Sequence, residues 1–139
     1  MNAEVPLDTP EYAGRVHFCG RLPYARYLSL LRISAAHVYL TVPFVLSWSC
    51  VEALATGCLV IGSDTPPVRE VIDPGVNGLL VPMYDPAAIA AQTAAAMADR
   101  QGMLPLRRAA RAMAMDRHAL DRCLPKQLEL VHRAADLAR

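Results

Sequence analysis

The sequence predicts an α/β fold, with a parallel sheet of about four strands flanked by helices and a helical C-terminal tail. Three observations support this prediction. Short apolar segments alternate with helical segments between residues 15 and 100, the pattern of parallel strands joined by crossover helices. The segment LVIG (59–62) is apolar throughout, as in a strand that is covered on both faces. From residue 101 onward the pattern is purely helical.

The first half of the chain predicts three strands and two helices. Residues 1–14 predict a loose lead-in because they contain two prolines and a glycine, and the alternating RVHFCG (15–20) predicts the first strand. A helix is expected from Pro23, followed by a second strand at HVYLT (37–41). A further helix should begin near Ser47 or Ser49 and end at Gly57, before the third strand at 59–64.

The second half predicts one more strand and mainly helices. A short helix within 63–72, a turn at 73–78 and a fourth strand at 78–82 come first. Asp85 as N-cap and Pro86 in the first turn predict a helix over 85–100, and Pro125 should break or kink the last helical segment. We expect three parts: a lead-in at 1–14, a sheet domain at 15–100, and C-terminal helices at 101–139 packing on it.

The net charge and its distribution bear on which partners the chain can bind. The net charge of +1 does not favour nucleic acid as a partner. Residues 1–99 hold 5 basic and 9 acidic side chains, whereas residues 100–139 hold 9 and 4. The basic tail is typical of a solvated helix face, and it is also compatible with contact to an acidic membrane or partner. The stripe formed by Leu120, Leu124, Leu128 and Val131 needs a packing partner.

Cysteines and histidines indicate neither disulfides nor a metal site. The four cysteines lie in predicted strands and helices without a C-x-x-C pair, which favours reduced core residues of a cytoplasmic protein. No histidine has the spacing of a zinc ligand. No signal peptide opens the chain, and no apolar run is long enough to span a membrane.

Glu52 is the one charged side chain between Arg32 and Asp64. It is expected about one turn into the helix that follows the second strand. A helix start at the carboxyl edge of a parallel sheet binds anions, and a nearby carboxylate can accept hydrogen bonds from the two hydroxyls of a ribose. Glu52 can equally complement the helix dipole, which is worth about 0.3–1 kcal/mol. Spacing alone leaves both interpretations open.

Two segments, EALATGCLVIGSD (52–64) and REVIDPGVNGLLVP (69–82), carry a resemblance to a known family. The sequence of residues 15–135 resembles the C-terminal, Rossmann-like domain of retaining glycosyltransferases with the GT-B fold. That family reads E-G-F-G-L-P-x-x-E-A-M-A-x-G-x-P-V, followed by E-[IV]-[IV]-x-[DP]-G-x-x-G-x-L-V. The resemblance implies half of a GT-B fold that lacks preceding strands and the acceptor-binding N-terminal domain.

The resemblance also implies a nucleotide-sugar site. Glu52 is similar to the second glutamate of the family's E-x7-E motif, which binds the ribose. Two loops are implied to contact the ligand: one that meets the diphosphate and sugar through its backbone amides, and one that lies against the base. Their residues are Val45, Leu46, Ser47 and Trp48 in the first loop, and Gly20, Arg21 and Leu22 in the second.

Two departures from the family bear on activity. Phe44 stands where the first glutamate is expected, so a contact to the donor hexose is lost. The Arg and Lys that neutralise the diphosphate in the family precede the matched segment and have no counterpart here. No catalytic residue is therefore assigned, and neither a metal ion nor a further cofactor is expected.

These observations imply a domain that binds a nucleoside diphosphate sugar for hexose transfer with retention, inactive without an N-terminal domain or a separate chain that supplies one. Three alternatives remain open: a non-catalytic half-domain that binds a nucleotide or a partner, a fragment of a nucleotide-sugar epimerase, and a fragmentary reading frame. Trp48 at a helix start is expected to pack against a strand, and Tyr24 and Tyr27 are expected at the edge of the core.

Overall fold

The structure, a computed structural model, describes residues 9–12 and 14–137 and has the predicted α/β fold. Its sheet contains three parallel strands in the order β1 (His37–Tyr39), β2 (Val60–Ser63) and β3 (Leu79–Val81). Residue 37 lies opposite 60, and residue 61 lies opposite 79. All four residues of the central strand β2 are buried, which explains its apolar sequence.

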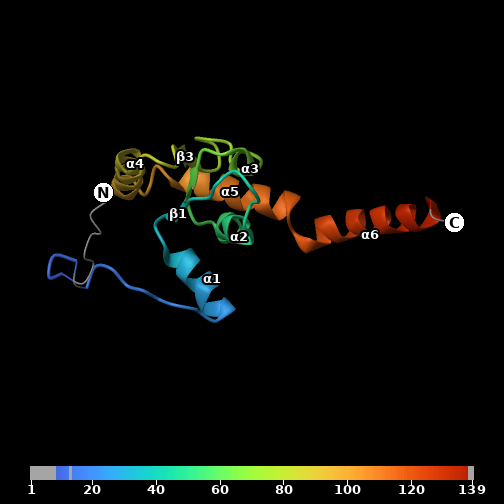
Figure 1. The fold of residues 1–139 in the computed structure, drawn as a ribbon, viewed down its shortest axis with the longest axis horizontal. Helices are drawn as coiled ribbons and strands as arrows, with labels where there is room; N and C mark the ends of the chain where they lie inside the picture. The colour runs from blue at the N-terminus through green and yellow to red at the C-terminus, as the bar shows by residue number, and fades with distance from the viewer. Residues whose placement is uncertain (1–8, 13, 138–139) are drawn as a thin grey trace.

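The strand predicted at residues 15–20 is not present, so the sheet has three strands rather than four. The segment is exposed, with Phe18 at 83% exposure. Figure 1 shows it running apart from the sheet toward helix α1 (Tyr24–Ile33). Alternation of apolar and polar residues forms a strand only where a neighbouring strand supplies hydrogen bonds, and none of the described strands pairs with this segment.

Helices cover both faces of the sheet (Figure 1). Helices α2 (Trp48–Thr56) and α5 (Leu104–Arg117) cover one face, where Leu54, Val60 and Ala110 belong to one apolar cluster. Helix α4 (Pro86–Ala98) covers the other face, where Ile61 packs in a second cluster with Ala96. Successive side chains of a strand point to opposite faces, so β2 contributes to both clusters.

The helix ends follow from local sequence. The Ser47 side chain accepts a hydrogen bond from the Ser49 amide and caps α2, which ends at Gly57 with φ 75°. Asp85 caps α4 by accepting from the Ala88 amide at 2.9 Å. The short helix α3 (Pro66–Arg69) lies between β2 and β3.

Helix α6 (Leu120–Leu137) contains no buried residue and projects away from the rest of the domain (Figure 1). Pro125 lies inside this helix, which continues past it. The structure therefore shows no break at Pro125, which was one of the two outcomes that the sequence predicted. Pro125 lacks the amide that would bond to the carbonyl of residue 121, and its ring crowds that carbonyl. The stripe of Leu120, Leu124, Leu128 and Val131 is exposed.

The predicted lead-in lies partly outside the described residues, which exclude 1–8 and 13. Residues 9–12 form a turn, in which the Tyr12 amide donates to the Thr9 carbonyl at 3.0 Å. Within the described part of the chain, no helix combines the length and apolar character that crossing a membrane requires.

Candidate functional site

The loop between β1 and α2 is held in place at the carboxyl end of the sheet. The Thr41 amide donates to Ser63 Oγ at 3.0 Å, and the Ser63 hydroxyl donates back to the Thr41 carbonyl at 2.9 Å. At the other end of the loop, the Ser47 amide donates to the Tyr39 hydroxyl oxygen at 2.9 Å. These bonds position the first turn of α2 relative to the strands.

The four predicted residues of this loop lie in different environments. Val45 is exposed, and Leu46 packs against the apolar cluster under α2. Leu46, Ser47 and Trp48 share a hollow of about 230 Å³ with residues that include Glu70 and His118. Trp48 is 78% exposed, so the expectation that it packs against a strand is wrong. Its ring is available to a ligand or partner.

Glu52 lies one turn beyond Trp48, and residues four apart are neighbours on a helix. The Tyr24 hydroxyl donates to Glu52 Oε1 at 2.9 Å. This hydrogen bond raises the pKa of Tyr24, because a charged phenolate would lie beside the carboxylate. Tyr24 is exposed and lies beside Glu52, so the expectation that it lies at the edge of the core is wrong. Tyr24 is the first residue of α1, 28 residues before Glu52, and the sequence carries no signal for this contact.

Tyr27 lies one turn after Tyr24 in α1, with the two ring centroids 6.3 Å apart. Its hydroxyl is buried and has no hydrogen-bond partner among the described residues. Burial is the main reason why the pKa of Tyr27 rises to about 12, and the nearby charge of Glu52 adds to the effect. Tyr27 therefore lies at the edge of the core, as expected.

The predicted residues Gly20, Arg21 and Leu22 immediately precede α1. Gly20 has φ +56°, a conformation that side chains rarely adopt and that turns the chain into the helix. Arg21 is exposed and Leu22 is half-buried. Tyr24, only two residues further on, links this segment to Glu52, and so the structure places the two regions close together.

Phe44 is 83% exposed in the loop between β1 and α2. No apolar neighbour covers it, so its ring is presented to solvent where the resembled family has a glutamate. A phenyl ring offers no hydrogen bond to a sugar hydroxyl. The loop therefore contributes backbone groups and apolar surface, but no carboxylate.

Arg69 forms an ion pair with Asp64, across the connection between β2 and α3. Its Nη2 donates to Asp64 Oδ2 at 2.8 Å and its Nε donates to Oδ1. This pairing lowers the pKa of Asp64 from its usual value. Arg69 is the last residue of α3 and Glu70 is its C-cap.

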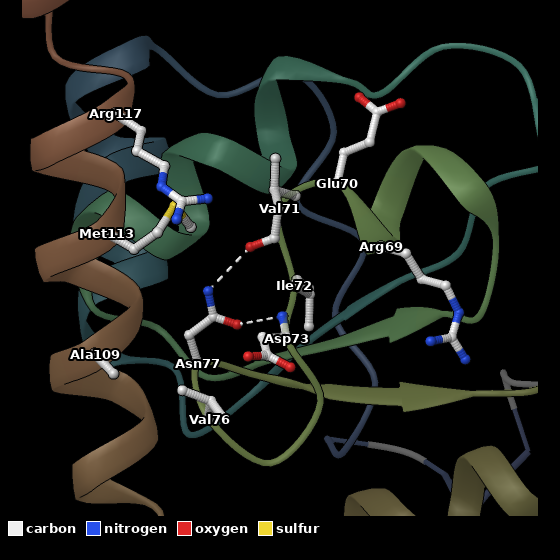
Figure 2. A pocket seen from close by; sticks show the side chains of 10 residues that line it. All are labelled: Arg69, Glu70, Val71, Ile72, Asp73, Val76, Asn77, Ala109, Met113 and Arg117. Atoms are coloured by element: carbon white, nitrogen blue, oxygen red, sulfur yellow. Dashed lines mark hydrogen bonds between the residues drawn. The ribbon is translucent and has the colours of Figure 1, made fainter.

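A hollow of about 320 Å³ separates α5 from residues 69–77 (Figure 2). Asn77 lies in it and ties the loop together: its side chain donates to the Val71 carbonyl at 3.0 Å and accepts from the Asp73 amide at 2.7 Å. Figure 2 shows the side chains of Arg69 and Glu70 pointing away from Asn77. None of the predicted nucleotide-sugar residues lines this hollow.

The described part of the chain contains no group of three or more His, Cys, Asp or Glu side chains that could hold a metal ion. Its four cysteines are free. Cys50 and Cys58 are buried core residues, whereas Cys19 is exposed and does not belong to the core as expected. Burial raises the pKa of the Cys50 thiol to about 12.

Several solved structures share this fold. The Anabaena protein Alr3699/HepE in complex with UDP and glucose matches with a TM-score of 0.81 and 20% identity, over 88% of this chain and 33% of that chain. The same protein in complex with UDP-glucose matches with a TM-score of 0.71 and 20% identity, over 75% and 29%. Sucrose-phosphate synthase (tll1590) from Thermosynechococcus elongatus matches with a TM-score of 0.75 and 26% identity, over 93% and 32%.

The chain spans about a third of the length of these structures, and its fold corresponds to half of a GT-B fold. No curated protein sequence matches it. The family model described as "Glycosyl transferases group 1" matches residues 8–114, more than half of the chain. The match includes both predicted ligand loops, Glu52 and all three strands. The chain therefore belongs to the family of glycosyl transferases group 1.

Proposed function

We propose that this chain binds a nucleoside diphosphate sugar as one half of a glycosyltransferase that transfers the hexose with retention. The observation that carries the proposal is the position of Glu52, beside the first turn of α2 and hydrogen-bonded to the exposed Tyr24. One protein of the same fold, Alr3699/HepE, forms complexes with UDP and with UDP-glucose, which supports a nucleotide sugar as the ligand.

Glu52 would bind the ribose. Its Oε1 accepts from Tyr24, and no hydrogen bond to its Oε2 is found within the described residues. A carboxylate oxygen has two lone pairs, so both oxygens can accept further bonds from a ribose diol. Tyr24 would then orient the carboxylate and keep it next to residues 20–22, which we assign to the base.

The diphosphate would lie at the start of α2. The first amides of a helix lack partners within the helix and carry its positive dipole end. Trp48 is the first residue of α2, and the bond from Ser47 to Tyr39 fixes the approach to it. Because the Ser47 amide is taken by Tyr39, the backbone amides of Val45, Leu46 and Trp48 are the ones that would meet phosphate oxygens, whatever the side chains are.

Calorimetric titration with UDP tests the proposal. Glu52→Gln should lower the affinity about tenfold or more, because hydrogen bonds to charged groups contribute roughly 1.5–3 kcal/mol. Glu129→Gln, the same change on the exposed helix α6, is the matched control and should bind like wild type. Equal UDP affinity of the Glu52→Gln variant and wild type would remove Glu52 from the site.

We further propose that these 139 residues alone do not transfer sugar, because the chain spans only about a third of the structures it resembles. Release of labelled glucose from UDP-glucose, with and without a saccharide acceptor, is the appropriate assay. Turnover above that of the Glu52→Gln variant would contradict this part of the proposal.

A further inference from the structure

Tyr27 carries a buried hydroxyl next to the carboxylate that we assign to the ribose. The side chain packs against the apolar cluster that contains Leu54 of α2, and its hydroxyl oxygen is shielded from solvent. This oxygen has no hydrogen-bond partner among the described residues. Buried hydroxyls are nearly always hydrogen-bonded, so the unpaired hydroxyl of Tyr27 indicates a partner that another state of the protein supplies.

Helix α1 packs against α2 and brings two tyrosines toward Glu52 (Figure 1). Tyr24 and Tyr27 are three residues apart in α1, so their side chains share one face of the helix, with ring centroids 6.3 Å apart. The Tyr24 hydroxyl donates to Glu52 Oε1 at 2.9 Å. Burial, and after it the nearby charge of Glu52, raises the pKa of Tyr27. Both hydroxyls therefore lie close to one carboxylate.

The two hydroxyls differ in their access to solvent. Tyr24 is 60% exposed, whereas the Tyr27 oxygen is buried. Glu52 is half-buried, so its side chain has a protein side and a solvent side. A ribose can approach Glu52 only from the solvent side, and the Tyr27 hydroxyl only from the protein side. Tyr27 therefore cannot contact the nucleotide, but it can contact the group that would bind the nucleotide.

Glu52 is free to accept a second bond from a tyrosine. Its Oε2 accepts no hydrogen bond from the described residues. The last torsion of a glutamate side chain has broad energy wells, so a small rotation of the carboxylate costs little. A bound ribose would displace water from the solvent side of Glu52. A hydrogen bond from the protein side then becomes stronger, because its surroundings are less polar.

We propose that Tyr27 is a positioning residue of the nucleotide site, whose hydroxyl donates to Glu52 when the ribose binds. The bond fixes the carboxylate that receives the two ribose hydroxyls. This inference rests on the proposed function, because it assigns a second tyrosine to the same carboxylate. Nucleotide binding then forms a hydrogen bond that folding alone leaves unmade. A buried water is the alternative partner of Tyr27, and it would give this hydroxyl a structural role only.

The test uses the Tyr27→Phe variant of the full chain, which loses the hydroxyl and keeps the ring in the core. Calorimetric titration measures its affinity for UDP and for the dideoxy analogue of UDP, whose sugar lacks both hydroxyls. The same substitution is also made in the Glu52→Gln background. Tyr84→Phe is the matched control, because Tyr84 is exposed and lies after β3, outside the assigned segments. Thermal unfolding reports the stability of each variant.

Tyr27→Phe should unfold at the wild-type temperature or slightly above it, because it loses a hydroxyl that has no partner. Its affinity for UDP should nevertheless fall about threefold to tenfold, with its affinity for the dideoxy analogue unchanged. In the Glu52→Gln background, Tyr27→Phe should not weaken UDP binding further, since the two side chains act as a pair. Tyr84→Phe should match wild type in every measurement.

NMR of the chain with isotope-labelled tyrosine rings gives a direct signature of the bond. Saturation with UDP should shift the ring-carbon signal of Tyr27, because its hydroxyl gains a charged acceptor. Saturation with the dideoxy analogue should leave this signal in place. A Tyr27 signal that does not respond to bound UDP would contradict the proposed bond.

Wild-type UDP affinity in Tyr27→Phe, or an equal loss of affinity for UDP and the dideoxy analogue, would overturn the inference. Wild-type UDP affinity together with lower stability would identify a buried water as the partner. The Glu52→Gln variant separates the two proposals. UDP affinity that does not depend on Glu52 would contradict the proposed function, whereas dependence on Glu52 without dependence on Tyr27 would contradict only the role of Tyr27.

Discussion

Replacing Tyr39 with phenylalanine tests the contact that holds the proposed diphosphate loop. Tyr39 is buried in β1, and its hydroxyl oxygen accepts the hydrogen bond from the Ser47 amide at 2.9 Å. The Tyr39→Phe variant keeps the ring in the core but leaves the Ser47 amide without this acceptor. Stability and nucleotide affinity should therefore both decrease.

The size of each effect follows from the exposure of Ser47. A buried donor that loses its partner costs about 1–3 kcal/mol. Ser47 is exposed, so water can reach the amide in part, and we expect the lower end of that range, about 1 kcal/mol. For a domain of this size that corresponds to a decrease in Tm of about 3–5 °C. The looser loop should also lower UDP affinity about threefold or more.

Urea unfolding and calorimetric titration measure the two effects. Tyr84→Phe is the matched control, since the Tyr84 hydroxyl is exposed and makes no hydrogen bond within the described residues, and this variant should match wild type in both assays. Unchanged stability of Tyr39→Phe would show that the bond to Ser47 does not form. Lower stability with unchanged UDP affinity would show that this loop does not take part in nucleotide binding.

Three further predictions concern the core and the surface. An added Cβ at Gly62 would lie 2.8 Å from a methyl group of α3, so Gly62→Ala should lower the free energy of unfolding by about 1–3 kcal/mol in urea titrations. Burial raises the pKa of Cys50 from 9.0 to about 12, so folding keeps this thiol protonated. The stability that this provides is complete below pH 9 and is lost as pH rises toward 12, by up to about 4 kcal/mol. Between pH 9 and 12 the Cys50→Ala variant should lose less stability than wild type, whereas the Cys19→Ala variant should lose as much as wild type. Finally, the exposed stripe of α6 should cause self-association that Leu124→Lys and Leu128→Lys reduce without unfolding the chain, and a concentration-independent wild-type monomer in sedimentation velocity would contradict this.

Local signals account for most of the correctly predicted fold. Ser47, Gly57 and Asp85 mark helix ends through their own backbone and side-chain chemistry, and the structure uses all three as predicted. The apolar run of β2 was sufficient to identify a central strand, because only such a strand buries both faces. The strand expected at 15–20 was wrong because its alternation gives no information about a pairing partner.

Only part of the proposed site can be named from a single element. The position of Glu52 about one turn into α2 pointed to this carboxylate, whereas the loop at 45–48 was named from the family resemblance. Tyr24 donates to Glu52 from a different helix, 28 residues earlier, and sequence spacing does not encode such a contact. The pairing of Arg69 with Asp64 was missed for the same reason, since it crosses from the end of β2 to α3.

We propose that residues 20–22, 45–48 and 52 form one nucleotide-sugar site. Titration of the isotope-labelled chain with UDP-glucose, followed by amide NMR shifts, tests it most directly. We expect saturable shifts concentrated at these three segments and at Tyr24, and much weaker shifts in the Glu52→Gln variant. Shifts that cluster instead around Asn77 and α5, or no saturable shifts at all, would contradict it.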